Sequence, residues 1–131
     1  MEYDELIAQA LTMPFEGWDF GVLRGRMVED SAALPWDYVE LVRGRLPYTG
    51  TLLDLGTGGG ELLASLAPLP ARTAATEGYA PNVPVARKRL EPLGVEVVEV
   101  GDDDRLPLPD GSFGPLTATA HRFALTAHLP A

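Results

Sequence analysis

The chain has 131 residues, of which 46% are hydrophobic, no cysteine, and a formal net charge of −9. This length and composition suit one domain with a hydrophobic core, and the lack of cysteine excludes disulfides, thiolate catalysis and cysteine-based metal sites. The acidic balance argues against nucleic acid and membrane partners, because both require many cationic contacts. No apolar run approaches a membrane span of roughly 20 residues, and the acidic N-terminus MEYDELIAQ does not resemble a signal peptide, so we expect a cytoplasmic protein.

The first fifty residues are predicted to form two helices joined by an irregular segment. Residues 2–13 carry apolar side chains at helical spacing, namely Leu6, Ile7, Ala10 and Leu11. Residues 14–34 show no clear period. Pro35 is predicted to open a second helix over 35–46, which has acidic residues early and arginines late, as the helix dipole favours.

The middle of the chain alternates between strand and helix patterns. TLLDL (51–55) is a candidate buried strand, ARTAATE (71–77) is a second by composition, and VEVVEV (95–100) is a third, rich in β-branched residues. Residues 61–69 and 82–93 between them read as helices. This order predicts an α/β fold with a parallel sheet and right-handed crossovers.

The end of the chain has a weaker pattern. Residues 101–111 form an acidic, proline-rich loop, and SFGPL (112–116) is a candidate start of a fourth strand. The remainder, TATAHRFALTAHLPA, has weak helical character. His121 and His128 would share a face of that helix, but the tail offers them no acidic partner, so we assign them neither a catalytic nor a metal role.

A glycine-rich turn, GTGGG, follows the first predicted strand. In a parallel sheet of this kind, ligands bind at the carboxyl ends of the strands. Glycines at 56, 58, 59 and 60 let the backbone turn sharply and approach a ligand closely. The alternative is a flexible strand–helix turn, because a glycine-rich loop alone is weak support for a site.

Two acidic residues stand where the next strands end. Glu77 closes the second strand, and a carboxylate there can accept hydrogen bonds from both hydroxyls of a ribose. Asp102 follows the third strand, where a carboxylate can accept from an exocyclic amine. Each acid alone could be merely solvated. Together with the glycines, in this order, they favour an adenosyl ligand.

These segments resemble the class I S-adenosylmethionine-dependent methyltransferases. LLDLGTGGGE is similar to their motif I, TEGYAPN to their acidic second-strand end, and GDDDRLPLPDGSF to a recurrent segment before their fourth strand. The upstream WDF, GR and PWDY elements are similar to those of a subgroup of small bacterial methyltransferases. The resemblance covers residues 15–113 and implies a Rossmann-like parallel sheet, here incomplete with three to four strands, preceded by N-terminal helices.

The resemblance implies a site for S-adenosylmethionine. Glu77 would take the ribose hydroxyls, Tyr79 would lie near the adenine, Asp102 would take the adenine amine, and Asp54 would support the glycine loop. The segment Trp18-Asp19-Phe20 would cover the site, unless Trp18, Phe20 and Trp36 are core anchors instead. The full implied cofactor-binding set is Asp54, Gly56, Thr57, Gly58, Gly60, Glu77, Gly78, Tyr79, Asp102 and Asp103, with no metal and no assigned catalytic residue.

Other nucleotide sites fit the loop less well. The dinucleotide fingerprint needs glycine at 56, 58 and 61, and position 61 is Glu61, whose carboxylate would repel a pyrophosphate. A phosphate-binding P-loop fails because no Lys-Ser/Thr pair follows the glycines. A nicotinamide-dependent oxidoreductase fragment is therefore the least favoured alternative.

The sequence departs from the family pattern after Phe113. The family continues with aspartate and an apolar strand, whereas Gly114 and Pro115 follow here, and proline disfavours a central strand. We therefore expect a cap over 1–50, a cofactor-binding half-domain over 51–113, and an atypical, truncated or frameshifted tail over 114–131; the alternative is a natural short form that completes its sheet with a partner.

Two functions follow from this organisation. The first is an S-adenosylmethionine-dependent methyltransferase-like protein whose methyl acceptor is unknown. The alternative is an inactive remnant that acts as a self-associating or binding module. An uncovered apolar edge on the first strand would favour a homo-oligomer such as a dimer.

Overall fold

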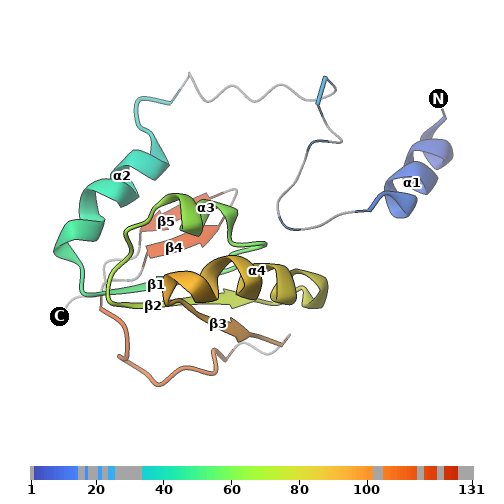
Figure 1. The fold of residues 1–131 in the computed structure, drawn as a ribbon. Coiled ribbons are helices and arrows are strands. Elements are labelled where there is room, and N and C mark those ends of the chain that lie inside the picture. The colour runs from blue at the N-terminus through green and yellow to red at the C-terminus, as the bar shows by residue number, and fades with distance from the viewer. Residues whose placement is uncertain are drawn as a thin grey trace.

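The computed structural model describes residues 2–14, 17, 21, 24–25, 34–101, 105–114, 117–120 and 123–126. Its helices are α1 (Tyr3–Thr12), α2 (Tyr38–Arg45), α3 (Glu61–Ser65) and α4 (Val83–Leu90), with short 3-10 turns η3 (Leu46–Tyr48), η4 (Ala80–Asn82) and η5 (Glu91–Leu93). Its strands are β1 (Thr51–Asp54), β2 (Arg72–Glu77), β3 (Glu96–Glu99), β4 (Thr117–Ala120) and β5 (Phe123–Thr126) (Figure 1). The helices and strands predicted before residue 101 are confirmed, each somewhat shorter than its pattern.

The first three strands form one parallel sheet in the order β1-β2-β3. Leu53 of β1 pairs with Ala74 of β2, and Ala75 of β2 pairs with Val97 of β3. All but the first residue of β2 is buried, as expected for the central strand of a parallel sheet. The predicted α/β architecture is therefore confirmed.

One face of this sheet carries the hydrophobic core. Helices α3 and α4 lie on the same side of the strands (Figure 1), and α4 packs against β3 and α3. The buried cluster draws on α2, α3, α4 and all three strands, with members Val42, Leu46, Leu52, Leu63, Leu66, Ala75, Ala86, Leu90, Val95 and Val97. This core fixes the carboxyl ends of β1 and β2 relative to the starts of α3 and α4.

Helix α2 begins later than its proline predicts. Asp37 is the N-cap, and its side chain accepts the backbone N–H of Glu40 at 3.1 Å. The helix therefore starts at Tyr38 rather than at Pro35, because a capping carboxylate satisfies a free N–H that proline cannot.

The helical prediction for the tail is wrong. Residues 117–120 and 123–126 form an antiparallel pair of strands, with Thr117 opposite Thr126 and Ala120 opposite Phe123. Threonine and phenylalanine favour strands, and backbone pairing between the two segments outweighs a weak helical period. Strand β4 lies beside β1, but the two belong to separate sheets. His121 and His128 lie outside the described residues.

The segment before β4 is fastened to the amino ends of β1 and β2. Arg72 donates through Nη1 to the carbonyl of Ser112 at 2.5 Å, and its guanidinium lies 4.6 Å from the centre of the Phe113 ring. The Gly114 N–H donates to Oγ1 of Thr51 at 2.8 Å. Residues 105–106 and 108–113 border a cavity of about 320 Å³ on the Leu53 side of the sheet, opposite the core helices.

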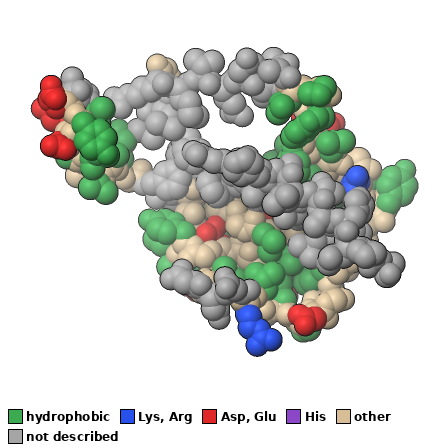
Figure 2. Space-filling model, turned by 180° about the vertical axis from the view of Figure 1, so that it is seen from behind, with side chains coloured by type: hydrophobic (Ala, Val, Ile, Leu, Met, Phe, Trp, Pro, Cys, Tyr) green, Lys and Arg blue, Asp and Glu red, His purple; other side chains and the backbone are tan. Residues whose placement is uncertain are grey.

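Helix α1 has no buried residue. Its apolar side chains are exposed, with Tyr3 at 74% and Leu11 at 81%, and Figure 2 shows them beside acidic groups at the margin of the molecule. Trp36 is 46% exposed, so it is not a core anchor, and Trp18 and Phe20 lie outside the described residues. No helix within the described ranges is long and apolar enough to cross a membrane.

Candidate cofactor site

The glycine loop folds back over the carboxyl end of β2. The N–H of Thr57 donates to the carbonyl of Thr76 at 2.9 Å, and the N–H of Gly56 donates to Oγ1 of Thr76 at 3.2 Å. Thr76 immediately precedes Glu77, the last residue of β2. The loop after β1 and the end of β2 are thus joined by direct hydrogen bonds, as a shared ligand site requires.

Two glycines of the loop serve different purposes. Gly56 and Gly60 both have left-handed backbones, with φ of +70° and +79°, which glycine adopts without strain. A Cβ on Gly60 would lie 2.7 Å from Cγ of Leu90, so close packing against α4 also requires glycine there. A Cβ on Gly56 would meet no described atom within 4 Å. Gly56 therefore faces open space at the strand ends, where a ligand can approach the backbone.

Glu77 is the most informative acid of the site. Its side chain is buried, with the residue only 6% exposed, and Oε1 accepts the N–H of Tyr79 at 2.8 Å. Its carbonyl accepts the N–H of Val100 at 3.0 Å, which ties the end of β2 to the end of β3. Oε2 is buried and has no hydrogen-bond partner among the described residues. A buried carboxylate oxygen needs donors, and a pair of ribose hydroxyls would supply them.

A second buried polar atom lies on the glycine loop. Thr57 is 1% exposed, and its Oγ1 finds no partner in the described part of the chain. Leaving a hydroxyl buried and unsatisfied costs about 1 to 3 kcal/mol. Thr57 stands in the loop after β1 and Glu77 ends β2, and the Thr76 hydrogen bonds join these two segments. The residues present therefore fit a polar ligand with hydroxyl groups at this position.

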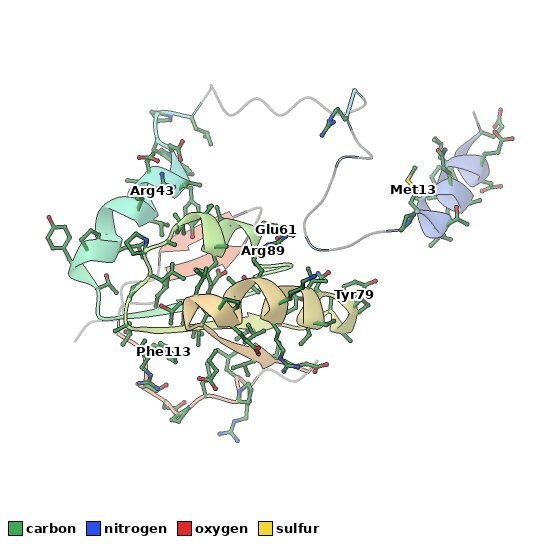
Figure 3. The ribbon with its side chains drawn as sticks, viewed as in Figure 1. Met13, Arg43, Glu61, Tyr79, Arg89 and Phe113 are labelled. Atoms are coloured by element: carbon green, nitrogen blue, oxygen red, sulfur yellow. The ribbon has the colours of Figure 1, made fainter. Side chains whose placement is uncertain are left out.

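The other predicted site residues differ in their exposure, and two of them lie outside the described residues. Asp54 ends β1, directly before the glycine loop, and is 3% exposed. Gly78 is exposed, and Tyr79 is 52% exposed at the approach to α4 (Figure 3). Asp102 and Asp103 lie outside the described residues. The structure therefore brings together the residues contributed by β1, β2 and the loops that follow them.

Two residues near the loop have no counterpart in the sequence prediction. Arg89 on α4 donates to the carbonyl of Gly59 at 2.6 Å and lies 3.3 Å from Oε1 of Glu61 (Figure 3). Asn82, which is 4% exposed, accepts the N–H of Gly17 through Oδ1 at 2.7 Å. Arg89 stands in the basic run 87–89, and nothing in that run indicates a role at the glycine loop. Asn82 could not be identified either, because no local pattern connects it with a residue 65 positions earlier.

The comparisons with known proteins agree with this geometry. A family model described as a methyltransferase domain matches residues 53–123. Among curated proteins, none matches the chain.

Several solved structures share the fold. S-adenosylmethionine-bound CalS10, an amino pentose methyltransferase from Micromonospora echinaspora, is 26% identical with a TM-score of 0.51 over 83% of this chain and 44% of that one. A SAM-dependent methyltransferase from Aquifex aeolicus is 24% identical with a TM-score of 0.52 over 75% of this chain and 55% of that one. YcgJ from Bacillus subtilis is 22% identical with a TM-score of 0.50 over 61% of this chain and 36% of that one.

The chain spans between 36% and 55% of the length of these three structures. The fold that they share with it is the Rossmann-like parallel sheet predicted from the sequence. Because the methyltransferase model matches over half of the chain, this protein belongs to the family of class I S-adenosylmethionine-dependent methyltransferases.

Proposed function

We propose that this protein binds S-adenosylmethionine at the carboxyl ends of β1 and β2 and serves methyl transfer to an acceptor of unknown identity. The observation that carries the proposal is the buried Oε2 of Glu77, which has no hydrogen-bond partner among the described residues. The family match and the S-adenosylmethionine-bound CalS10 structure support the same cofactor.

Each loop has a distinct part in this site. Gly56 lets the cofactor approach the backbone, and the carboxylate of Glu77 accepts from its ribose hydroxyls. Thr57 offers a hydroxyl within the loop, and Asp54 supports the loop from beneath. Asp102, Asp103 and Tyr79 complete the adenine end as proposed contacts.

When bound, S-adenosylmethionine supplies an electrophilic methyl group on a sulfonium centre. The protein contributes chiefly by holding the methyl donor in line with the acceptor and by excluding water. A general base is needed only where the acceptor must lose a proton, and we assign none. Because the chain spans about half or less of most of the structures it resembles, the acceptor side and turnover itself are part of the proposal.

The alternative function is a cofactor-binding module that self-associates without turnover. Among the described residues, β1 pairs only with β2 in its sheet, and β4 lies beside it without joining that sheet. A strand edge of this kind can pair with a second copy. We propose a homo-oligomer through this edge in either case. A cytoplasmic location is also proposed, because a chain without cysteine lacks the disulfides that stabilise many small secreted domains.

Calorimetric titration with S-adenosylhomocysteine tests the cofactor site. The parent is expected to bind, and Glu77→Gln is expected to lose about 10- to 100-fold in affinity, the range for a hydrogen bond to a charged group. Glu96→Gln is the matched control, because Glu96 is an exposed carboxylate at the amino end of β3, away from the strand ends that form the site. Absence of binding by a folded parent would refute the proposal, as would equal losses in the two variants.

A further inference from the structure

Gly17 comes from the N-terminal part of the chain, yet it contacts residues beside the proposed cofactor site. It is buried, and its N–H donates to Oδ1 of Asn82 at 2.7 Å, although 65 positions separate the two residues. Asn82 stands at the end of η4, directly before α4 and five residues after Glu77. The contact therefore joins the N-terminal part of the chain to the loop that follows β2.

Gly17 also touches the loop that follows β1. A Cβ built on it would lie 3.5 Å from Cα of Gly59 and would overlap Oε1 of Glu61, and its φ is +60°. Both the space and the backbone conformation thus require glycine. Gly17 is consequently wedged between the two loops that line the proposed cofactor site.

The residues that Gly17 contacts on the loop after β1, Gly59 and Glu61, are themselves held by Arg89. Arg89 binds the carbonyl of Gly59 and lies 3.3 Å from the Glu61 carboxylate (Figure 3). The side chains of this ion pair are about two-fifths exposed, at 41% and 40%. Surface ion pairs of this kind contribute little by themselves. Among the described residues, the hydrogen bond to Asn82 gives Gly17 a buried, directional contact.

We infer that Asn82 is a positioning residue that anchors Gly17 across the two cofactor loops, and that this anchor slows cofactor exchange. The inference rests on the proposed function. Gly17 contacts both the loop after β1 and the loop after β2. While its N–H is bonded to Asn82, Gly17 must move before these two loops can separate. Releasing the anchor lets the loops part more often, so a bound cofactor leaves faster.

A matched pair of variants tests the anchor. Asn82→Leu keeps the approximate volume and removes the acceptor, whereas Asn82→Asp keeps an acceptor oxygen. NMR hydrogen exchange at the Gly17 amide measures the anchor without any cofactor. Stopped-flow measurement of S-adenosylhomocysteine dissociation shows whether the anchor slows release of the ligand. Thermal unfolding shows that each variant is folded.

The amide is expected to exchange slowly in the parent and in Asn82→Asp, and rapidly in Asn82→Leu. Dissociation is expected to be about tenfold faster in Asn82→Leu alone, the factor that corresponds to one buried hydrogen bond. Exchange in the parent as fast as in exposed backbone would overturn the anchor, even if Asn82→Leu failed to fold. Equal dissociation rates in all three proteins would overturn the coupling. A folded parent that does not bind S-adenosylhomocysteine would refute the proposed function and the coupling with it, while amide exchange would still decide whether Asn82 anchors Gly17.

Discussion

The N–H of Tyr79 donates to Oε1 of Glu77 at 2.8 Å, and this bond holds the acid that ends β2 with its second oxygen buried. A carboxylate fixed in this way by a residue two positions later is oriented before any ligand arrives. Preorganised acceptors bind donors without an added ordering cost. In the proposed site, a short strand–turn segment would therefore prepare the carboxylate that accepts from the ribose hydroxyls.

The hydroxyl of Thr57 provides a test that separates ligand binding from stability. Thr57→Val keeps the side-chain shape and removes a buried oxygen that has no partner in the described part of the chain. Unfolding in urea is expected to show unchanged or higher stability, by up to about 1 kcal/mol, because an unsatisfied polar atom is lost. Affinity for S-adenosylhomocysteine is expected to fall by about tenfold. A destabilised variant with unaltered affinity would contradict this assignment.

Gly60 and Gly56 are expected to respond differently to alanine. Both substitutions carry the strain of a left-handed backbone, about 1 to 2 kcal/mol. Gly60→Ala also forces a Cβ to within 2.7 Å of the Leu90 side chain, and overpacking of this kind adds about 1 to 3 kcal/mol. Chemical denaturation should therefore show a clearly larger loss for Gly60→Ala. Combining it with Leu90→Ala, which opens space, should give less than the sum of the two single losses; strict additivity would argue against the contact.

Arg72 and Phe113 are expected to be energetically coupled. The guanidinium lies 4.6 Å from the ring centre, within the range of a cation–π contact. A double-mutant cycle with Arg72→Met and Phe113→Leu should give a coupling of about 0.5 to 1 kcal/mol in the free energy of unfolding. Arg72 also donates to the Ser112 carbonyl. Arg72→Met alone should therefore lose more unfolding free energy than Phe113→Leu loses when it is added to the Arg72→Met variant. A coupling of zero would mean that the Arg72–Phe113 contact contributes nothing, and that the hydrogen bonds of Arg72 and Thr51 hold the segment before β4.

Self-association through the β1 edge predicts a characteristic salt dependence. Each copy carries a formal net charge of −9, so two copies repel one another at low ionic strength. Added salt screens that repulsion while leaving apolar and backbone contacts intact. Light scattering after gel filtration should show a concentration-dependent dimer that becomes more populated between low and moderate salt. A monomer under all these conditions would rule out the proposed homo-oligomer, and dissociation by salt would indicate a different, charge-based interface.

Much of the candidate site can be located from the sequence because its patterns are local. The glycine turn, the buried strand before it and Glu77 at the next strand end each carry a short-range pattern, and parallel strands bring their carboxyl ends to one edge of the sheet. The tail was mispredicted because its helical period is weak and the pairing of Thr117 with Thr126 is a contact between strands. The start of α2 was displaced because the side-chain bond from Asp37 to the Glu40 N–H is visible only as geometry.

The sequence by itself determined the order of strands and helices before residue 101 and the glycine loop, because hydrophobic periodicity and turn chemistry act over a few residues. It determined the family through short motifs that are local as well. Only the tertiary structure decided that Gly17 rests on Asn82, that Arg89 binds the Gly59 carbonyl, and that Oε2 of Glu77 and Oγ1 of Thr57 are left buried without partners among the described residues. The two hydrogen bonds join residues 65 and 30 positions apart, and the unpartnered atoms depend on burial by the whole core. Side-chain packing creates such neighbours, and no local pattern in the chain encodes them.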